Sequence, residues 1–252
     1  MSKIHRYDLI FSLGEACSCS ELLRKNGLQI KAYPFDWLFG SDFVGRCKIL
    51  AERLASFIEK KDLEFSFEER NIHCKAYHNK LTDLTFNHDF HKDIPFEEMY
   101  PQVKEKYERR ITRLLKEIEN AQKILIVYLE TPITNHAKIE EKDIVAGFAY
   151  IQQAYAGKDI HLMYIRNERN SVLQEKQLTK DIKVISCDYK AGPPQLDYVV
   201  CFSTLDKILK SYRLNLPLTK KLKISCLRLT ARLIPNKQMR KNVRKKWHIY
   251  RK

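Results

Sequence analysis

The chain has 252 residues, of which 44% are hydrophobic and 31% are charged, and its formal net charge is +15. This length can bury the core of one large domain or of two small ones. No run of eighteen apolar residues occurs, so we expect no membrane-spanning helix. The charged N-terminus leads into an apparent strand without the apolar region of a signal peptide, so we expect a cytoplasmic protein.

The positive charge is confined to the C-terminal segment. Residues 1–206 carry 30 basic and 31 acidic residues, whereas residues 207–252 carry sixteen Lys and Arg and no Asp or Glu. We therefore predict an α/β domain over 1–206 and a basic amphipathic tail over 207–252. Because the first part is close to neutral, the overall charge is a poor argument for nucleic acid as its partner.

Apolar runs alternate with amphipathic segments along the chain. The run KILIVYL is the strongest signal for a buried strand. The expected elements are, in order, a strand at Tyr7–Leu13, a helix at Ser18–Asn26, an aromatic loop at Lys31–Gly40, a helix from Ser41 to about Lys60, strands at Leu63–Phe67 and Thr82–Phe90, a helix at Glu97–Asn120, a strand at Lys123–Leu129, a helix at Ile139–Tyr155, and strands at Ile160–Ile165 and Ile182–Cys187. This alternation predicts an α/β fold with a layered, largely parallel sheet flanked by helices.

The first helix has explicit end signals. Ser18 followed by Glu21 has the spacing of a capping box, and Gly27 follows the last turn as expected of a C-terminal cap. Cys17 would then lie just outside the first turn, where unpaired N–H groups and the helix dipole lower a thiol pKa and favour the nucleophilic thiolate. The alternative is a small apolar residue packed on the helix, and we expect that packing role for Cys19.

Four short motifs, SLGEAC, LLRKNGL, YPFDWL and FNHDF, resemble in this order a bacterial family described as putative papain-like cysteine peptidases. The resemblance covers residues 7–90 most clearly. Ala16 and Ala32 depart from the family pattern at positions where polar residues are common, which bears on the polar support of a site. The resemblance implies a thiol nucleophile that hydrolyses or transfers the acyl group of an amide or ester.

The resemblance implies Cys17 as nucleophile and His88 as general acid/base, and we assign Asp36 as the residue that orients the histidine. His88 shares a strand face with Phe86 and Phe90, which predicts a buried ring, and a satisfied core histidine is the alternative. Asp36 could instead only cap the backbone of its loop. The expected substrate contacts are Ser12, Gly14, Phe35, Trp37 and Asp89. Aromatic side chains are more often core residues, and Asp89 points away from His88.

No metal or cofactor site is expected. The chain has no Cys-x-x-Cys pair, no G-x-G-x-x-G and no P-loop. His73, His78 and His91 lie near Cys74, but their spacing matches no common ligand pattern, so we expect solvated histidines. His136 follows the strongest strand, where α/β sheets place ligands, and is a reserve candidate.

The sequence of the tail predicts a helix that lies on the anionic, inner surface of the membrane. An apolar stripe is formed by Leu222, Cys226, Leu229 and Leu233. Basic residues flank it at Lys221, Arg228 and Arg232, and Trp247 and Tyr250 follow. Two alternatives stay open, namely packing of the stripe on the α/β domain and binding of nucleic acid. The alternative to an enzyme is a membrane-associated, non-hydrolytic component of surface-polysaccharide or cell-envelope biosynthesis.

Overall fold

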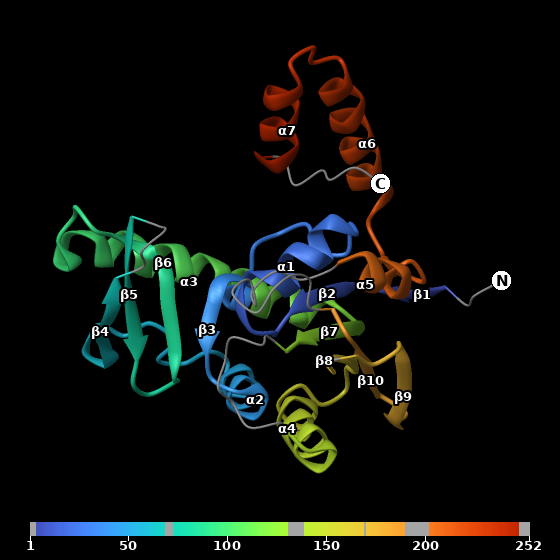
Figure 1. The fold of residues 1–252 in the computed structure, drawn as a ribbon, viewed down its shortest axis with the longest axis horizontal. Helices are drawn as coiled ribbons and strands as arrows, with labels where there is room; N and C mark the ends of the chain where they lie inside the picture. Colours follow the sequence, from blue (N-terminus) through green and yellow to red (C-terminus); the bar gives the residue numbers. More distant parts are fainter. Residues whose placement is uncertain (1–3, 69–72, 131–138, 169, 190–201, 247–252) are drawn as a thin grey trace.

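The computed structural model describes residues 4–68, 73–130, 139–168, 170–189 and 202–246 (Figure 1). Its central sheet has five strands in the order β2-β7-β8-β10-β9. Their bounds are β2 Leu9–Ser12, β7 Lys123–Leu129, β8 Asp159–Asn167, β10 Ile182–Cys187 and β9 Gln174–Thr179. The first four strands are parallel, and β9 is antiparallel at one edge. The predicted α/β fold with a largely parallel, helix-flanked sheet is confirmed.

Helices cover both faces of this sheet. Alternate strand residues point to opposite faces, so Phe11 and Ile126 enter one core cluster, whereas Ile10 and Val127 enter another. The first cluster contains residues of α2 (Phe43–Ala51), α3 (Phe96–Asn120) and α4 (Glu141–Ala154), and the second contains residues of α1 (Ala16–Lys25) and α5 (Phe202–Leu209). Both faces are therefore buried, which explains why the parallel strands read as nearly continuous apolar runs.

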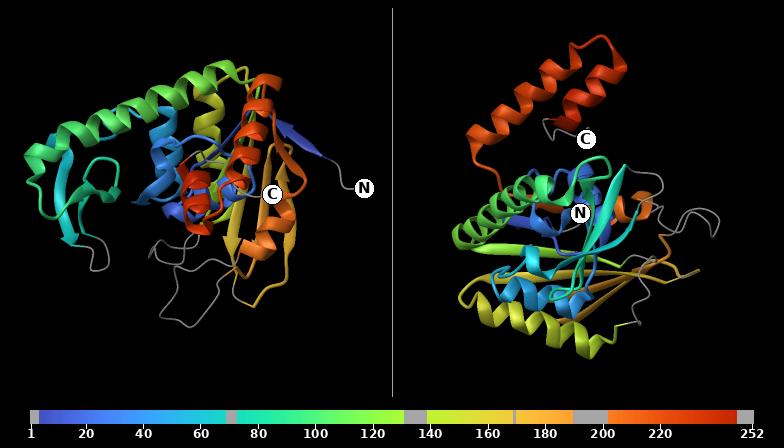
Figure 2. Two further views of the ribbon diagram at one scale, coloured as in Figure 1. Left: turned by 90° about the horizontal axis from the view of Figure 1, so that it is seen from above. Right: turned by 90° about the vertical axis from the view of Figure 1, so that its left-hand side faces the viewer.

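A second, antiparallel sheet has the order β3-β6-β5-β4. Its bounds are β3 Leu38–Gly40, β6 Leu84–His91, β5 Cys74–Asn79 and β4 Leu63–Glu68, and the short helices η1 (Pro34–Trp37) and η2 (Lys60–Asp62) precede β3 and β4. The long helix α3 extends across both sheets (Figure 2). The sequence prediction missed β5, which lies in the polar segment between the two expected strands.

Two other predictions about local structure are wrong. The helix after the aromatic loop is capped by Asp42, whose carboxylate accepts from the backbone N–H of Gly45 at 2.7 Å, and not by Ser41. It ends at Ala51 rather than near Lys60, because Arg53, Leu54 and Ser56 have left-handed backbone angles that stop a right-handed helix.

The C-terminal region belongs partly to the α/β body. The strand β11 (Tyr212–Leu214) pairs in parallel with β1 (His5–Tyr7), and Leu209 and Tyr212 are buried in the second core cluster. Beyond them, α6 (Leu218–Arg232) and α7 (Lys237–Lys246) form a hairpin that stands off the sheets (Figure 1). In the described ranges, no helix has both the length and the apolar composition needed to cross a bilayer.

Candidate functional site

Cys17 lies in the first turn of α1, directly after the first strand of the central sheet. The helix begins at Ala16, and Glu15 is its N-cap residue without a side-chain capping bond, so the predicted capping box of Ser18 is wrong. The C-terminal signal is confirmed, since Gly27 has a φ of +71° and donates its N–H to Arg24.

The turn before Cys17 is sterically constrained. A Cβ on Gly14 would lie 2.6 Å from the backbone nitrogen of Leu129, so only glycine fits against β7 here. Ala16 has a φ of +59°, a left-handed angle that is strained for a residue with a Cβ. The chain therefore bends sharply between β2 and α1, and Cys17 follows this bend.

Arg46 holds this turn from inside. Its side chain is fully buried and donates to the carbonyl oxygens of Leu13 and Gly14 at 3.3 and 3.1 Å. The same guanidinium also donates to the carbonyl oxygens of Leu38, Gly40 and Ser41. One cation thus joins the turn before Cys17 to the strand β3 that follows the PFDW segment. The sequence prediction missed Arg46, which lies on an ordinary-looking helix.

Cys17 itself is half-buried, whereas Cys19 is fully buried and donates its thiol to the carbonyl of Val127 at 3.4 Å. The expected packing role of Cys19 is confirmed. Burial and the nearby Glu21 carboxylate raise the pKa of the Cys17 thiol, while its own backbone N–H acts in the opposite direction. The predicted lowering of the Cys17 pKa is therefore wrong, because desolvation outweighs the donors of the first turn.

Asp36 is the centre of a buried network in η1. Its carboxylate forms an ion pair with Arg24, accepts from Gln29 Nε2 at 2.9 Å and accepts from the backbone N–H of Tyr33 at 2.9 Å. Burial raises the pKa of Asp36, and Arg24 opposes this effect. The Ser20 hydroxyl donates to the carbonyl oxygen of Asp36 at 3.0 Å. Asp36 therefore fixes the PFDW turn onto α1, the helix that carries Cys17.

Two of the expected substrate contacts, Phe35 and Trp37, have different environments. Phe35 is fully buried and packs edge-on against Phe57, with ring centroids 5.5 Å apart, so it is a core residue. Trp37 is partly exposed, and the guanidinium groups of Arg24 and Arg110 lie 4.5 and 4.6 Å from its ring centroid. Trp37 is thus an aromatic residue near α1 that keeps accessible surface.

Ser12 and Gly14 are also buried. The backbone N–H of Ser12 donates to Gln29 Oε1 at 3.2 Å, and its side chain is fully covered. These two residues shape the helix start from inside the protein and leave no side-chain surface for a substrate.

His88 is exposed, and Asp89 is buried. The predicted burial of the His88 ring is wrong because β6 bulges at this point. Phe86 pairs with Tyr77 and Phe90 pairs with Lys75, so four steps along β6 match two steps along β5 and the regular alternation of faces is lost. Asp89 pairs with Lys106 and accepts from the Tyr107 hydroxyl at 2.7 Å.

The elements that carry the three predicted catalytic residues are neighbours. Both α1 and β6 contact η1. In the β3–β6 ladder Leu38 pairs with Phe86, so Asp36 and His88 each lie two residues beyond this pair at the same end of the ladder. Within the described part of the chain, no hydrogen bond joins Cys17 to His88 or His88 to Asp36.

A polar cluster at the carboxyl end of the central sheet is a further feature of the site that the sequence prediction missed. The carboxyl-end cluster consists of Glu15, Tyr128, Glu130, Tyr164 and Arg166. The Tyr128 hydroxyl donates to Glu15 Oε1 at 2.7 Å, and the Tyr164 hydroxyl donates to Glu130 Oε1 at 2.7 Å. The two tyrosine rings stack with centroids 5.0 Å apart. A single tyrosine in each of two largely apolar strands, Tyr128 in β7 and Tyr164 in β8, with Glu130 directly after β7, was the available signal.

Glu130 is the perturbed acid of this cluster. Arg166 Nε lies 3.3 Å from Glu130 Oε1, and the backbone N–H of Asn167 donates to the other oxygen at 3.2 Å. Burial nevertheless raises the pKa of Glu130. Ligands of open α/β sheets bind at this end of the strands, and α1 with Cys17 begins there. The reserve candidate His136 lies outside the described residues.

The remaining histidines of the antiparallel sheet make local contacts. His78 Nδ1 lies 3.3 Å from the Thr85 hydroxyl, and His91 Nδ1 lies 3.4 Å from Asp93. The rings of His73 and His91 stack with centroids 6.2 Å apart. These contacts give them structural partners and suggest no shared ligand.

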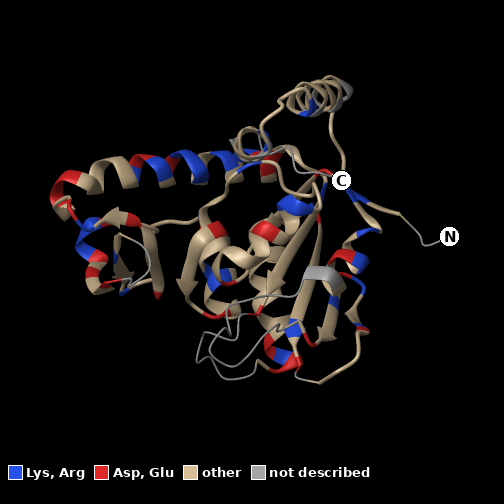
Figure 3. Cartoon of the chain, turned by 45° about the horizontal axis from the view of Figure 1, so that its top comes forward, with Lys and Arg blue, Asp and Glu red and all other residues tan. Residues whose placement is uncertain are grey.

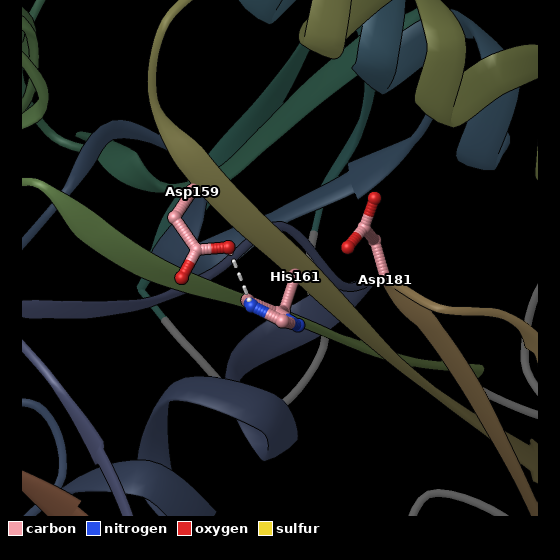
Figure 4. Close-up of side chains that lie close together, drawn as sticks. All are labelled: Asp159, His161 and Asp181. Carbon is pink, nitrogen blue, oxygen red and sulfur yellow. Dashed lines mark hydrogen bonds and ion pairs between the residues drawn. The ribbon is translucent and has the colours of Figure 1, made fainter.

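One group of possible metal ligands lies at the opposite, amino end of the central sheet (Figure 4). Its members are Asp159, His161 and Asp181. His161 Nε2 lies 2.8 Å from Asp159, Lys123 Nζ lies 3.0 Å from the other Asp159 oxygen, and Gln152 donates to Asp181 at 3.2 Å. Because a lysine already neutralises the most exposed acid, we assign no metal to this group.

Two hollows on the described surface lie away from Cys17. One is bordered by the start of β2, the loop 30–33, the end of α3 and the connection from β11 to α6. The other lies between residues 54–59 and α3. The chemistry of Cys17 and its surroundings, rather than a hollow, therefore marks the candidate site.

Comparison with known proteins agrees with the four-motif resemblance. Residues 8–169 match the model of a family described as putative papain-like cysteine peptidase (DUF1796). The chain is also similar to the uncharacterized protein R408 of Acanthamoeba polyphaga mimivirus, with 27% identity over 135 residues. This match covers 47% of the chain and 60% of the viral protein. The relative is viral, so the expected bacterial origin is not established. No solved structure matches the chain.

Proposed function

Because the chain belongs to the family of putative papain-like cysteine peptidases, we propose that it is a cysteine-nucleophile hydrolase or acyltransferase acting through Cys17. The observation that carries the proposal is the position of Cys17 in the first turn of α1, after a bend fixed by Gly14 and Arg46. The first N–H groups of a helix have no intrahelical partner and can stabilise an oxyanion.

The raised pKa of Cys17 means that the mechanism needs a general base. A thiol that is protonated at neutral pH needs a base when the substrate binds, in contrast to a preformed thiolate. We assign this role to the exposed His88. Its imidazole accepts the thiol proton as Sγ bonds to the substrate carbonyl carbon, and it then returns the proton to the departing amine or alcohol. Water or another acceptor cleaves the resulting thioester and restores the thiol.

In this proposal, Asp36 is a positioning residue that holds the PFDW segment in place. Its carboxylate oxygens are used by Arg24, Gln29 and the Tyr33 backbone, so it orients the loop that lies between Cys17 and His88. Trp37 keeps accessible surface beside α1 and is the residue we assign to substrate contact, with Ser12, Gly14, Phe35 and Asp89 supporting from inside.

The proposal is tested by burst kinetics with p-nitrophenyl acetate, a small ester that makes few demands on specificity. The native protein should release nitrophenolate in a burst close to one equivalent, and Cys17→Ala should abolish the burst. His88→Ala should slow it by about 100-fold. Cys226→Ser, which changes an exposed cysteine of α6, is the matched control and should leave the burst unchanged. A burst of equal size in Cys17→Ala contradicts the proposal.

The non-hydrolytic alternative is favoured by one observation, namely the raised pKa of Cys17 without a hydrogen bond from its thiol to a base among the described residues. It predicts no burst with p-nitrophenyl acetate and no change on substitution of Cys17 or His88. Support for a role in surface-polysaccharide or cell-envelope biosynthesis would then require a binding partner found independently of the thiol.

A further inference from the structure

The helical hairpin α6–α7 is chemically unlike the rest of the chain. The segment 207–252 has sixteen basic and no acidic residues, whereas the preceding 206 residues are close to neutral. Figure 3 shows α3 coloured for both signs of charge along its length, whereas the sequence of α6 and α7 contains no Asp or Glu. The hairpin also stands off both sheets (Figures 1 and 2).

The hairpin has its own packing. At 3.6 residues per turn, Ile224, Leu227 and Ala231 fall on one face of α6, and they are partly or fully buried. The connection to α7 is fixed by Asn236, whose side chain accepts from the backbone N–H groups of Gln238 and Met239 at 2.9 and 3.0 Å. The two helices contact each other.

The opposite face of α6 is exposed in the part of the chain that the structure describes. Leu222, Leu229 and Leu233 lie within about 40° of one another around the helix and are 58%, 58% and 80% exposed. Cys226 belongs to the same stripe and is also exposed. The stripe therefore does not pack on the α/β body, which removes one of the two alternatives considered from the sequence.

We propose that this face of α6 docks on an anionic lipid surface. The sixteen Lys and Arg residues of the segment 207–252 complement anionic headgroups, and the leucine stripe enters the apolar boundary below them. The phosphates of duplex nucleic acid would attract the basic residues, but they offer no apolar surface for the three leucines of the stripe. The helix would lie in the plane of the interface, since it is too short and too charged to cross it.

The proposal is independent of the thiol chemistry. Lipid binding should be the same in the native protein and in Cys17→Ala, so its failure and the failure of the proposed enzymatic activity are separate results. The proposed partner is a lipid surface, recognised by its negative charge and its apolar interior rather than by a particular headgroup.

Vesicle flotation with the full-length protein tests the proposal. The probes are vesicles of phosphatidylcholine alone and of phosphatidylcholine mixed in equal parts with phosphatidylglycerol. The protein should float with the anionic vesicles only, and binding should weaken as salt is raised. The double variant Leu229→Gln/Leu233→Gln should lower the affinity by about tenfold or more.

The matched control is Leu81→Gln/Val172→Gln, which removes the same kind of exposed apolar side chain from the α/β body. It should bind as the native protein does, and circular dichroism should show both variants equally folded. Equal binding by the stripe variant and the control overturns the proposal. It is also overturned if no protein floats, or if a short DNA duplex binds the protein while anionic vesicles do not.

Discussion

The two ends of the central sheet carry similar side chains in opposite environments. At the carboxyl end, Glu15 and Glu130 accept hydrogen bonds from buried tyrosines, and burial raises the pKa of Glu130. At the amino end, Asp159 is exposed beside Lys123 and His161, and these partners lower its pKa. Perturbed acids in dry surroundings concentrate at functional sites, so the comparison favours the carboxyl end, where α1 presents Cys17.

The largest expected effect concerns the cations at the two ends. Arg46→Ala should lower the free energy of unfolding by about 3 kcal/mol or more, because five carbonyl oxygens that are buried or partly buried lose their donor. Lys123→Ala, which removes an exposed ion pair at the amino end, should cost about 1 kcal/mol or less. Urea denaturation measures both. If the two variants lose similar free energies of unfolding, the buried and exposed cations contribute equally, and the contrast between the two ends is wrong.

The next effect concerns the buried tyrosines. Tyr128→Phe and Tyr164→Phe each remove one hydroxyl that donates to a carboxylate at 2.7 Å, and each should cost about 1.5–3 kcal/mol. Tyr150→Phe changes an exposed tyrosine and should be neutral within about 0.5 kcal/mol. If the two buried variants are as stable as Tyr150→Phe, the tyrosine hydroxyls do not stabilise the carboxylates of Glu15 and Glu130.

The two ends should respond to pH with opposite sign. The raised pKa of Glu130 means that its contribution to stability declines as the pH rises from the unfolded value of 4.5 through the folded pKa. The lowered pKa of Asp159 means that its contribution is present above the unfolded value of 3.8 and is lost as the pH falls through the folded pKa.

Urea denaturation of Glu130→Gln and Asp159→Asn between about pH 3 and pH 7 checks these signs. Relative to the variant, the native protein should lose stability with rising pH in the first case and with falling pH in the second. The second effect should be the smaller, since Asp159 is exposed. Curves of the same sign would show that the two acids share one environment.

The smallest expected effect is at the thiol. Glu21→Gln removes the carboxylate that helps to raise the Cys17 pKa, so the midpoint of the pH dependence of Cys17 alkylation by iodoacetamide should move to lower pH. Glu105→Gln, on the exposed side of α3, is the control. An unchanged midpoint in Glu21→Gln would mean that burial alone sets the pKa.

The sequence predicted best those elements whose pattern is dominated by burial. The strands Lys123–Leu129 and Ile182–Cys187 were predicted with the bounds that the structure has, and the helix Glu97–Asn120 differs by one residue. The strand β9, with sequence QEKQLT, was missed because an exposed edge strand needs no apolar face. The strand β5 was missed because it lies in a polar segment that joins two predicted strands.

The candidate site was harder to predict because its geometry depends on long-range contacts. The start of α1 depends on the approach of Gly14 to Leu129, and the exposed position of His88 depends on a bulge relative to a strand that was not expected. The donor to Glu15 is Tyr128, 113 residues later in the chain. Local patterns identified Cys17 and Asp36 as notable residues, but they could not show which partners surround them.

The most direct test of the account is the location of an acyl adduct. After brief reaction with p-nitrophenyl acetate and quenching in acid, peptide mapping by mass spectrometry can assign acetylation among the seven cysteines. The account predicts a thioester on Cys17 that forms much more slowly in His88→Ala, with none on the buried Cys19. Acetylation confined to other cysteines such as Cys226, or a Cys17 adduct that forms equally fast without His88, would contradict it.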